Sequence, residues 1–112
     1  MDDDERREIR AAFDEAMNMT PKQLRDWLET DESAAVGWHE EDESESVGHA
    51  SGRRIVEIKG KKVADLDEED FQHMRKVVGY VHRHSKQGGP EHDKQHSRWR
   101  YSLMNWGHDP EK

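Results

Sequence analysis

Residues 67–87 read DEEDFQHMRKVVGYVHRHSKQ and predict the longest helix of the chain. Asp67 is a favourable N-cap, and the acidic first turn and basic last turn suit the helix dipole. Gly-Gly-Pro at 88–90 ends the pattern. The spacing predicts an amphipathic helix from Glu68 to about Lys86. Its apolar face carries Phe71, Met74, Val77, Val78 and Val81.

Two helices are predicted in the N-terminal third of the chain. Thr20, Pro21 and Gln23 match a capping box with proline at the first helical position, and apolar residues follow at 24–28. Before them, an acidic start and helical apolar spacing predict a helix over about 4–17. The apolar positions of these two helices are Ile9, Ala12, Phe13, Ala16, Met17, Leu24, Trp27 and Leu28.

For the segments before and after the central helix, the sequence is compatible with more than one structure. Ser51 can cap a helix over 53–62, but the β-branched residues there, interrupted by Gly60, also fit a short hairpin, and we favour the helix. A last amphipathic helix is predicted over about 92–105, ended by Gly107. Trp106 is expected to dock on the central helix, with a binding tip as the alternative.

These elements predict an all-α fold, a small bundle of about four to five helices in a single domain, residues 1–112. We expect the N-terminal helix, residues 1–19, to be loosely attached. Residues 37–50 are expected to form an acidic loop or linker between the second and third helices.

The composition limits both the core and the classes of function. Of 112 residues, 30% are hydrophobic and 39% charged, which predicts one thin apolar core. The absence of cysteine excludes disulfides and thiolate chemistry. No apolar run is long enough for a membrane span or a signal peptide, so the expected location is the cytoplasm. The 26 acidic residues, with more arginine than lysine, favour a halophilic setting.

Charge is divided unequally along the chain. Residues 1–46 hold 16 acidic and 5 basic residues, whereas residues 47–112 hold 10 acidic and 13 basic ones. On the central helix, Lys76 and Arg83 lie two turns apart beside Gly79 and could face a phosphate backbone. We therefore expect a non-enzymatic nucleic-acid-binding protein, most simply a DNA-binding one. Its expected contacts are Lys76, Tyr80, Arg83, Lys86, Arg98 and Arg100, with Tyr80 as a packing or stacking neighbour.

Other readings of the same residues stay open. The cations could form a solvated face or pair with the acidic half of the chain. Alternatively, the acidic residues 40–45 and Trp38 could engage a basic partner protein. His92 and His96 have the i, i+4 spacing of metal ligands, but nothing completes a zinc set, so no metal or other cofactor is expected. No catalytic motif is present, and we expect no enzyme.

Three stretches resemble a small family of single-domain proteins classed as a domain of unknown function. They are SVGHASGRRIVEI at 46–58, HMRKVVGYVHRH at 73–84 and WRYSLMNWGHDP at 99–110. Members in prokaryotes and fungi are often labelled DNA-binding protein. The resemblance covers about 20–110 and implies a compact all-helical domain with a role around DNA, without assigning site residues. Gly60 and the strongly acidic stretch 40–45 depart from the family pattern.

Overall fold

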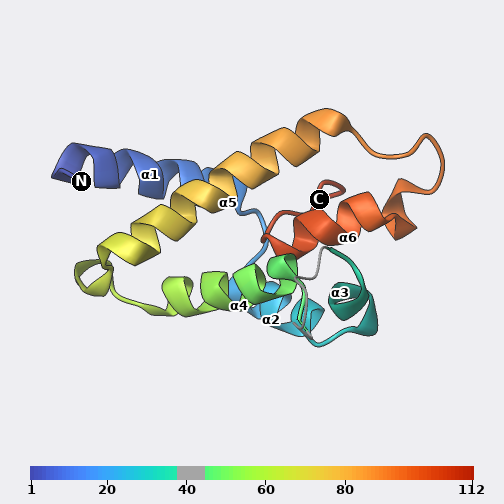
Figure 1. Ribbon diagram of the computed structural model, residues 1–112, viewed down its shortest axis with the longest axis horizontal. Helices are drawn as coiled ribbons and strands as arrows, with labels where there is room; N and C mark the ends of the chain where they lie inside the picture. Colours follow the sequence, from blue (N-terminus) through green and yellow to red (C-terminus); the bar gives the residue numbers. More distant parts are fainter. Residues whose placement is uncertain (38–44) are drawn as a thin grey trace.

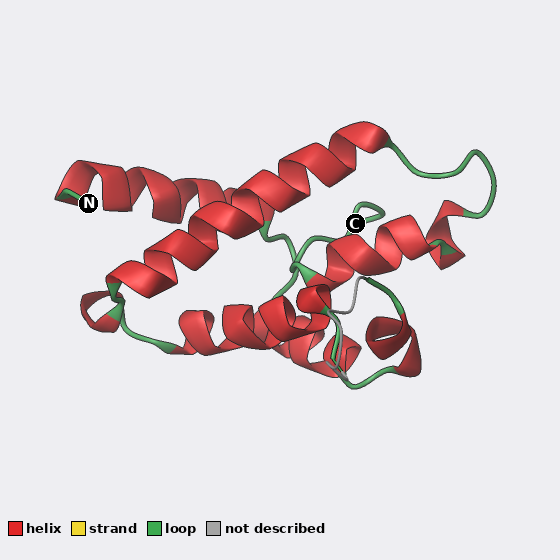
Figure 2. Ribbon diagram, viewed as in Figure 1, coloured by secondary structure: helices red, strands yellow, loops and turns green. Residues whose placement is uncertain are grey.

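The computed structural model describes residues 1–37 and 45–112, and every regular element in these ranges is helical (Figures 1 and 2). The prediction of a small all-α bundle is confirmed. The α-helices are α1 (Asp3–Ala16), α2 (Pro21–Leu28), α3 (Asp31–Ala35), α4 (Val47–Gly60), α5 (Glu68–Gln87) and α6 (Arg98–Asn105), with single 3₁₀ turns η1 (Val63–Asp65) and η2 (Lys94–His96).

Capping signals explain where the two best-predicted helices begin. At α2, the Thr20 side chain accepts a hydrogen bond from the Gln23 amide while the Gln23 side chain accepts from the Thr20 amide. At α5, Asp67 and Asp70 make the same reciprocal pair. Both boxes satisfy amides that would otherwise lack partners in the first turn. The predicted starts of these helices are confirmed.

The start of α4 corrects the sequence prediction. The segment is a helix and not a hairpin, but its N-cap is Ser46 and not Ser51, so residues 47–50 are helical instead of part of a loop. Ser51 and Gly52 are buried inside the helix. A Cβ on Gly52 would lie 2.6 Å from the backbone oxygen of Asn105. These small residues therefore permit close packing of α4 against α6 and do not mark the end of a linker.

Two smaller elements also differ from the prediction. The last helix begins at Arg98 with Ser97 as N-cap, because Asp93 adopts a left-handed conformation (φ 52°) and residues 94–96 form η2. The short helix α3 was not predicted at all. It is held by a Thr30 N-cap and by burial of Ser33, and five residues are too few to show a helical period.

The helices pack in pairs around one apolar core. Helix α1 lies along α5, α2 lies along α4, and α6 contacts α2, α4 and α5 (Figure 1). We expected the N-terminal helix to be loosely attached. Instead, Phe13 on α1 is 1% exposed, and the helix forms part of the core. The core residues are Ile9, Phe13, Ala16, Met17, Met19, Leu24, Ile55, Ile58, Phe71, Met74, Val77, Val81 and Trp106.

The C-terminal turn fastens α6 to the α1–α2 junction. Trp106 is the C-cap of α6, and Gly107 follows in a left-handed conformation (φ 82°). His108 donates from Nδ1 to the Ala16 carbonyl at 2.8 Å. The Asn18 side chain donates to the Asp109 carbonyl at 2.9 Å and accepts from the Asp109 amide at 2.7 Å. Chain segments from opposite ends of the sequence are thus joined directly.

Asp70 is a fully buried carboxylate at the start of α5. It accepts hydrogen bonds from Arg54 and Lys61, both at 2.8 Å, and from the Asp67 amide at 3.1 Å. Burial alone would raise the pKa of Asp70, but the Lys61 and Asp67 hydrogen bonds, with the charges of Lys61 and Arg54, hold that pKa below its usual value. The carboxylate therefore ties α4 and the following turn to α5 most strongly while it is ionised.

The depressed pKa of Asp70 gives an expected acid dependence of stability. Its contribution is complete above the unfolded-state value near 3.8 and is lost as the pH falls through the lower folded-state pKa. Asp70→Asn should lower the free energy of unfolding by about 2 kcal/mol at pH 7 and flatten its decline below about pH 4. Urea denaturation from neutral to acid pH measures both effects. Glu69→Gln controls for net charge, and parallel pH curves for wild type and Asp70→Asn would contradict the assignment.

Candidate nucleic-acid interface

The exposed face of α5 carries most of the cations that the sequence singled out. Lys76, Arg83 and Lys86 are all exposed, and none of them forms an ion pair within the described residues. No acidic residue occurs between 71 and 90. Lys76 and Arg83 lie seven residues apart, which separates them by about 10 Å along the helix axis. The expected row of cations on this helix is therefore present and accessible.

Gly79 lies between these two cations on the helix surface. The guanidinium of Arg83 folds back over it, with Nη1 3.0 Å from the position that a Cβ on Gly79 would occupy. The missing side chain lets the guanidinium lie close to the backbone. Arg75, one position before Lys76, points to the other side and pairs with Glu5 of α1 at 2.6 Å. Some basic residues of α5, such as Arg75, thus form ion pairs within the fold, and others do not.

Tyr80 is a packing residue beside this row. Its ring stacks on Trp106 with centroids 4.3 Å apart and 15° between the planes. Burial raises the pKa of the Tyr80 hydroxyl, opposed by a hydrogen bond with Ser102. The docking of Trp106 on the central helix is therefore confirmed, and Tyr80 is the residue of α5 on which it packs.

The two arginines of α6 have different environments. Arg98 is exposed at the first position of the helix. Arg100 donates from Nε and Nη2 to both carboxylate oxygens of Asp109 at 3.0 and 2.9 Å, and from Nη1 to the Gln95 carbonyl at 2.9 Å. The hydrogen bond from Arg100 holds the pKa of Asp109 below its usual range. Arg100 is thus an internal clamp on the C-terminal turn and not the free phosphate contact that we expected.

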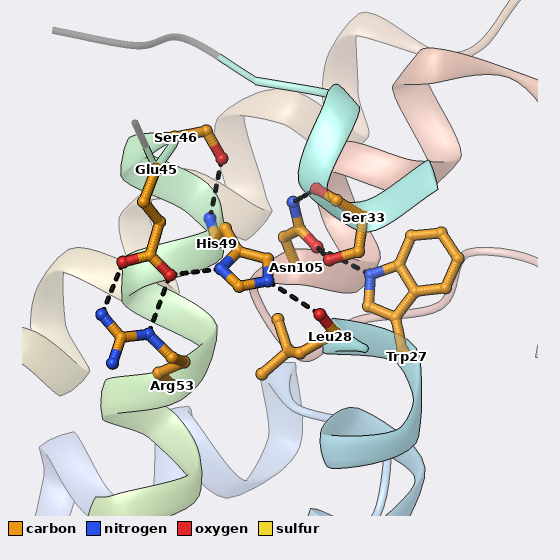
Figure 3. Close-up of polar contacts among 8 residues, drawn as sticks. All are labelled: Trp27, Leu28, Ser33, Glu45, Ser46, His49, Arg53 and Asn105. Atoms are coloured by element: carbon orange, nitrogen blue, oxygen red, sulfur yellow. Dashed lines mark hydrogen bonds and ion pairs between the residues drawn. The ribbon is translucent and has the colours of Figure 1, made fainter. Parts of the chain in front are cut away.

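A separate polar cluster positions α2, α3, α4 and α6 (Figure 3). Buried Asn105 accepts hydrogen bonds from Trp27 Nε1 at 2.7 Å and from the Ser33 hydroxyl, and donates to the Ser33 carbonyl at 3.1 Å. Its side-chain oxygen and nitrogen therefore both have partners. We interpret this part of the cluster as structural.

The other part of the cluster holds the beginning of α4. The Glu45 carboxylate contacts Nδ1 of His49 and pairs with Arg53, whose Nε lies 2.8 Å away. The other ring nitrogen of His49, Nε2, lies 2.8 Å from the Leu28 carbonyl on α2. Glu45 belongs to the acidic stretch 40–45 that we considered for a partner protein. The rest of that stretch up to residue 44, and Trp38, lie outside the described residues.

The described histidines form no metal cluster, and the described helices include no membrane span. His96 pairs through Nδ1 with Asp93 at 2.8 Å. Within residues 1–37 and 45–112, no three His, Asp or Glu side chains are grouped so that they could hold a metal ion. None of the helices in these ranges has the length and apolar character needed to cross a bilayer.

Sequence reasoning missed Arg54 and His73 as part of the same surface. Arg54 lies on α4 and His73 on α5, and together with Lys76 they line a hollow between the two helices. Neither residue lies at a helical spacing from another candidate binding residue that would have singled it out in the sequence. The two come together only because α4 packs against α5.

Among the comparisons with known proteins, one match identifies the family of the chain. No curated protein and no solved structure matches it. The model of a family described as protein of unknown function (DUF3140) matches residues 12–104, which is most of the chain. The resemblance to a small family of unknown function is thereby confirmed, and the chain belongs to the DUF3140 family.

Proposed function

We propose that the protein binds nucleic acid, most simply DNA, through phosphate contacts on the exposed face of α5. The observation that carries the proposal is the accessible cation row of Lys76, Arg83 and Lys86, which lies within the stretch 71–87 of α5 that holds no acidic residue. Arg98 on α6 extends the set of exposed cations. Arg100 and Tyr80 support the surface from within the fold by clamping the C-terminal turn and packing on Trp106.

The expected binding is electrostatic and weakly dependent on base sequence. Phosphate contacts by lysine and arginine release counterions, so affinity falls as salt rises. The chain has a net charge of −8, and its acidic residues are concentrated before residue 47. This acidic half repels phosphate, and part of it, helix α1, packs along α5 and pairs with Arg75 through Glu5. The proposed contacts are therefore restricted to the exposed cations of α5 that do not pair with α1. The proposal requires no catalytic step.

The test is a fluorescence-anisotropy titration of labelled duplex DNA across a salt series. Wild type should bind saturably, and Lys76→Ala/Arg83→Ala should weaken binding and reduce the slope of log affinity against log salt by roughly two. The reason is that two phosphate contacts are lost while the fold, monitored by circular dichroism, is kept.

Lys22→Ala/Arg25→Ala is the matched control, because it removes the same charge from exposed positions on α2. It should leave the salt slope unchanged. Equal losses in both double variants would show a general charge effect and contradict a site on α5. Absence of binding at every salt concentration in which the protein stays folded would contradict the proposed function.

A further inference from the structure

A shallow hollow lies between α4 and α5, beside the cation row. It has a volume of about 360 Å³ and is lined by Arg54, Glu69, Gln72, His73 and Lys76. Four of these five side chains come from the first half of α5, and Arg54 reaches across from α4. Two permanent cations thus share the hollow with an amide, an imidazole and one carboxylate.

Arg54 has hydrogen-bonding capacity that the fold does not use. One of its terminal nitrogens donates to Asp70 at 2.8 Å, and its Nε is buried without a partner in the described chain. The side chain as a whole is 34% exposed. A guanidinium carries five N–H donors, and its planar geometry suits a phosphate or carboxylate group. Asp70 fixes Arg54 in place. Because Nε is buried, the donors left for a ligand are the terminal N–H groups that Asp70 does not use.

His73 is held in a fixed orientation at the same place. Its Nε2 lies 3.0 Å from the Ser51 hydroxyl, and its ring is nearly parallel to Trp106, with centroids 6.3 Å apart. When Ser51 donates to Nε2, the ring proton resides on Nδ1, which has no hydrogen-bond partner in the described residues. In that tautomer, the Nδ1 proton is the donor that neutral His73 would offer to a ligand.

His73 lies near two cations, one on each of the two helices. Burial lowers the pKa of His73, and the charges of Arg54 on α4 and of Lys76 on α5 lower it further. The Ser51 contact and the charge of Asp70 oppose this shift. From the C-terminal turn, the uncharged ring of Trp106 covers the imidazole. An anion in the hollow would offset the two cations and make protonation of His73 easier.

We propose that this hollow binds one phosphate group of a nucleic-acid strand, with Arg54 and Lys76 as cationic donors and Gln72 and His73 as neutral ones. The inference rests on the proposed function, and it names the point at which a single phosphate is held most closely. Lys76 belongs both to the hollow and to the cation row. The hollow therefore anchors the strand at one end of that row.

The experiment uses inorganic phosphate as the probe and the histidine ring signals in NMR spectra as the readout. Adding phosphate at constant ionic strength should raise the pKa of His73 by about one unit, the size of effect that a nearby opposite charge produces. Exposed His82, His92 and His96 provide internal controls in the same spectra. Lys76→Ala should abolish the shift, whereas Lys86→Ala, which removes the same charge outside the hollow, should preserve it.

Two results would overturn the site. One is a His73 signal that phosphate does not move, and the other is an equal shift of all the histidines. If duplex DNA binds with the expected salt dependence while phosphate leaves His73 unchanged, the proposed function stands and the hollow does not. If phosphate moves His73 selectively but duplex DNA does not bind, the hollow stands as a phosphate site and the proposed function fails.

A second titration identifies the source of the phosphate group. Duplexes with and without a 5′-phosphate are compared on wild type and Gln72→Ala. Tighter binding of the phosphorylated duplex that is lost in the variant would support a terminal phosphate. Equal affinities that both fall in the variant would support an internal phosphodiester. Equal affinities that Gln72→Ala leaves unchanged would contradict a DNA phosphate in the hollow.

Discussion

Asn105→Ala is expected to lower the free energy of unfolding by about 3 kcal/mol, because it removes a buried amide and leaves buried polar partners unsatisfied. Asn105 is fully buried, and it is the partner of the Trp27 indole and of both the hydroxyl and the carbonyl of Ser33. These contacts link α2, α3 and α6 (Figure 3). Urea denaturation followed by tryptophan fluorescence and by circular dichroism measures the loss.

A double-mutant cycle with Ser33→Ala separates the lost hydrogen bonds from the lost volume. In wild type, Ser33→Ala removes a hydroxyl that donates to Asn105. In the Asn105→Ala background that hydroxyl has already lost its acceptor, so the same change should cost at least about 0.5 kcal/mol less. Additive effects of the two changes, or a loss below about 1 kcal/mol for Asn105→Ala alone, would contradict the assigned network.

Gly52→Ala is expected to destabilise the protein by about 3 kcal/mol, near the upper end of the usual cost of overpacking. Alanine is the better helix former, so local propensity alone predicts a gain in stability. The added Cβ would lie 2.6 Å from the Asn105 carbonyl oxygen and 2.6 Å from a methyl carbon of Leu28. The backbone oxygen belongs to α6 and cannot move like a flexible side chain, so α4 and α6 must separate.

Gly60→Ala supplies the matched control on the same helix. Nothing lies within 4 Å of a Cβ at Gly60. The change should therefore stabilise the protein by about 0.5 kcal/mol through helix propensity. Thermal unfolding of both variants should give shifts of opposite sign. Two shifts in the same direction would contradict the close approach of α4 and α6 at Gly52.

The elements predicted correctly from the sequence are those whose signals are local. The capping pairs at Thr20 and Asp67, and the apolar period of α5, involve residues three or four positions apart. The start of α4 could not be predicted in this way. In the sequence, Ser51 and Gly52 resemble residues of a loop. Their role in packing against α6 becomes evident only when the two helices are placed together.

In the candidate interface, too, the residues placed by helical spacing were predicted, and those placed by the packing of separate elements were not. Helical spacing was sufficient to place Lys76 and Arg83 on one exposed face. Arg100 looked equivalent in the sequence, but the turn after α6 brings Asp109 to its guanidinium. Arg54 and His73 were not identified, since a site shared by two helices leaves no spacing pattern in either one.

The connection between Asn18 and Asp109 constrains the order in which the chain can fold. These residues lie 91 positions apart and exchange two hydrogen bonds. Helical bundles usually fold rapidly because most of their contacts are short-range. Here the most extensive pairings, α1 with α5 and α2 with α4, join helices that are far apart in sequence. Closing a loop of this length costs entropy before its contacts repay it. The junction of α1 and α2 is therefore completed late, and refolding should be slower than the helical content alone would suggest.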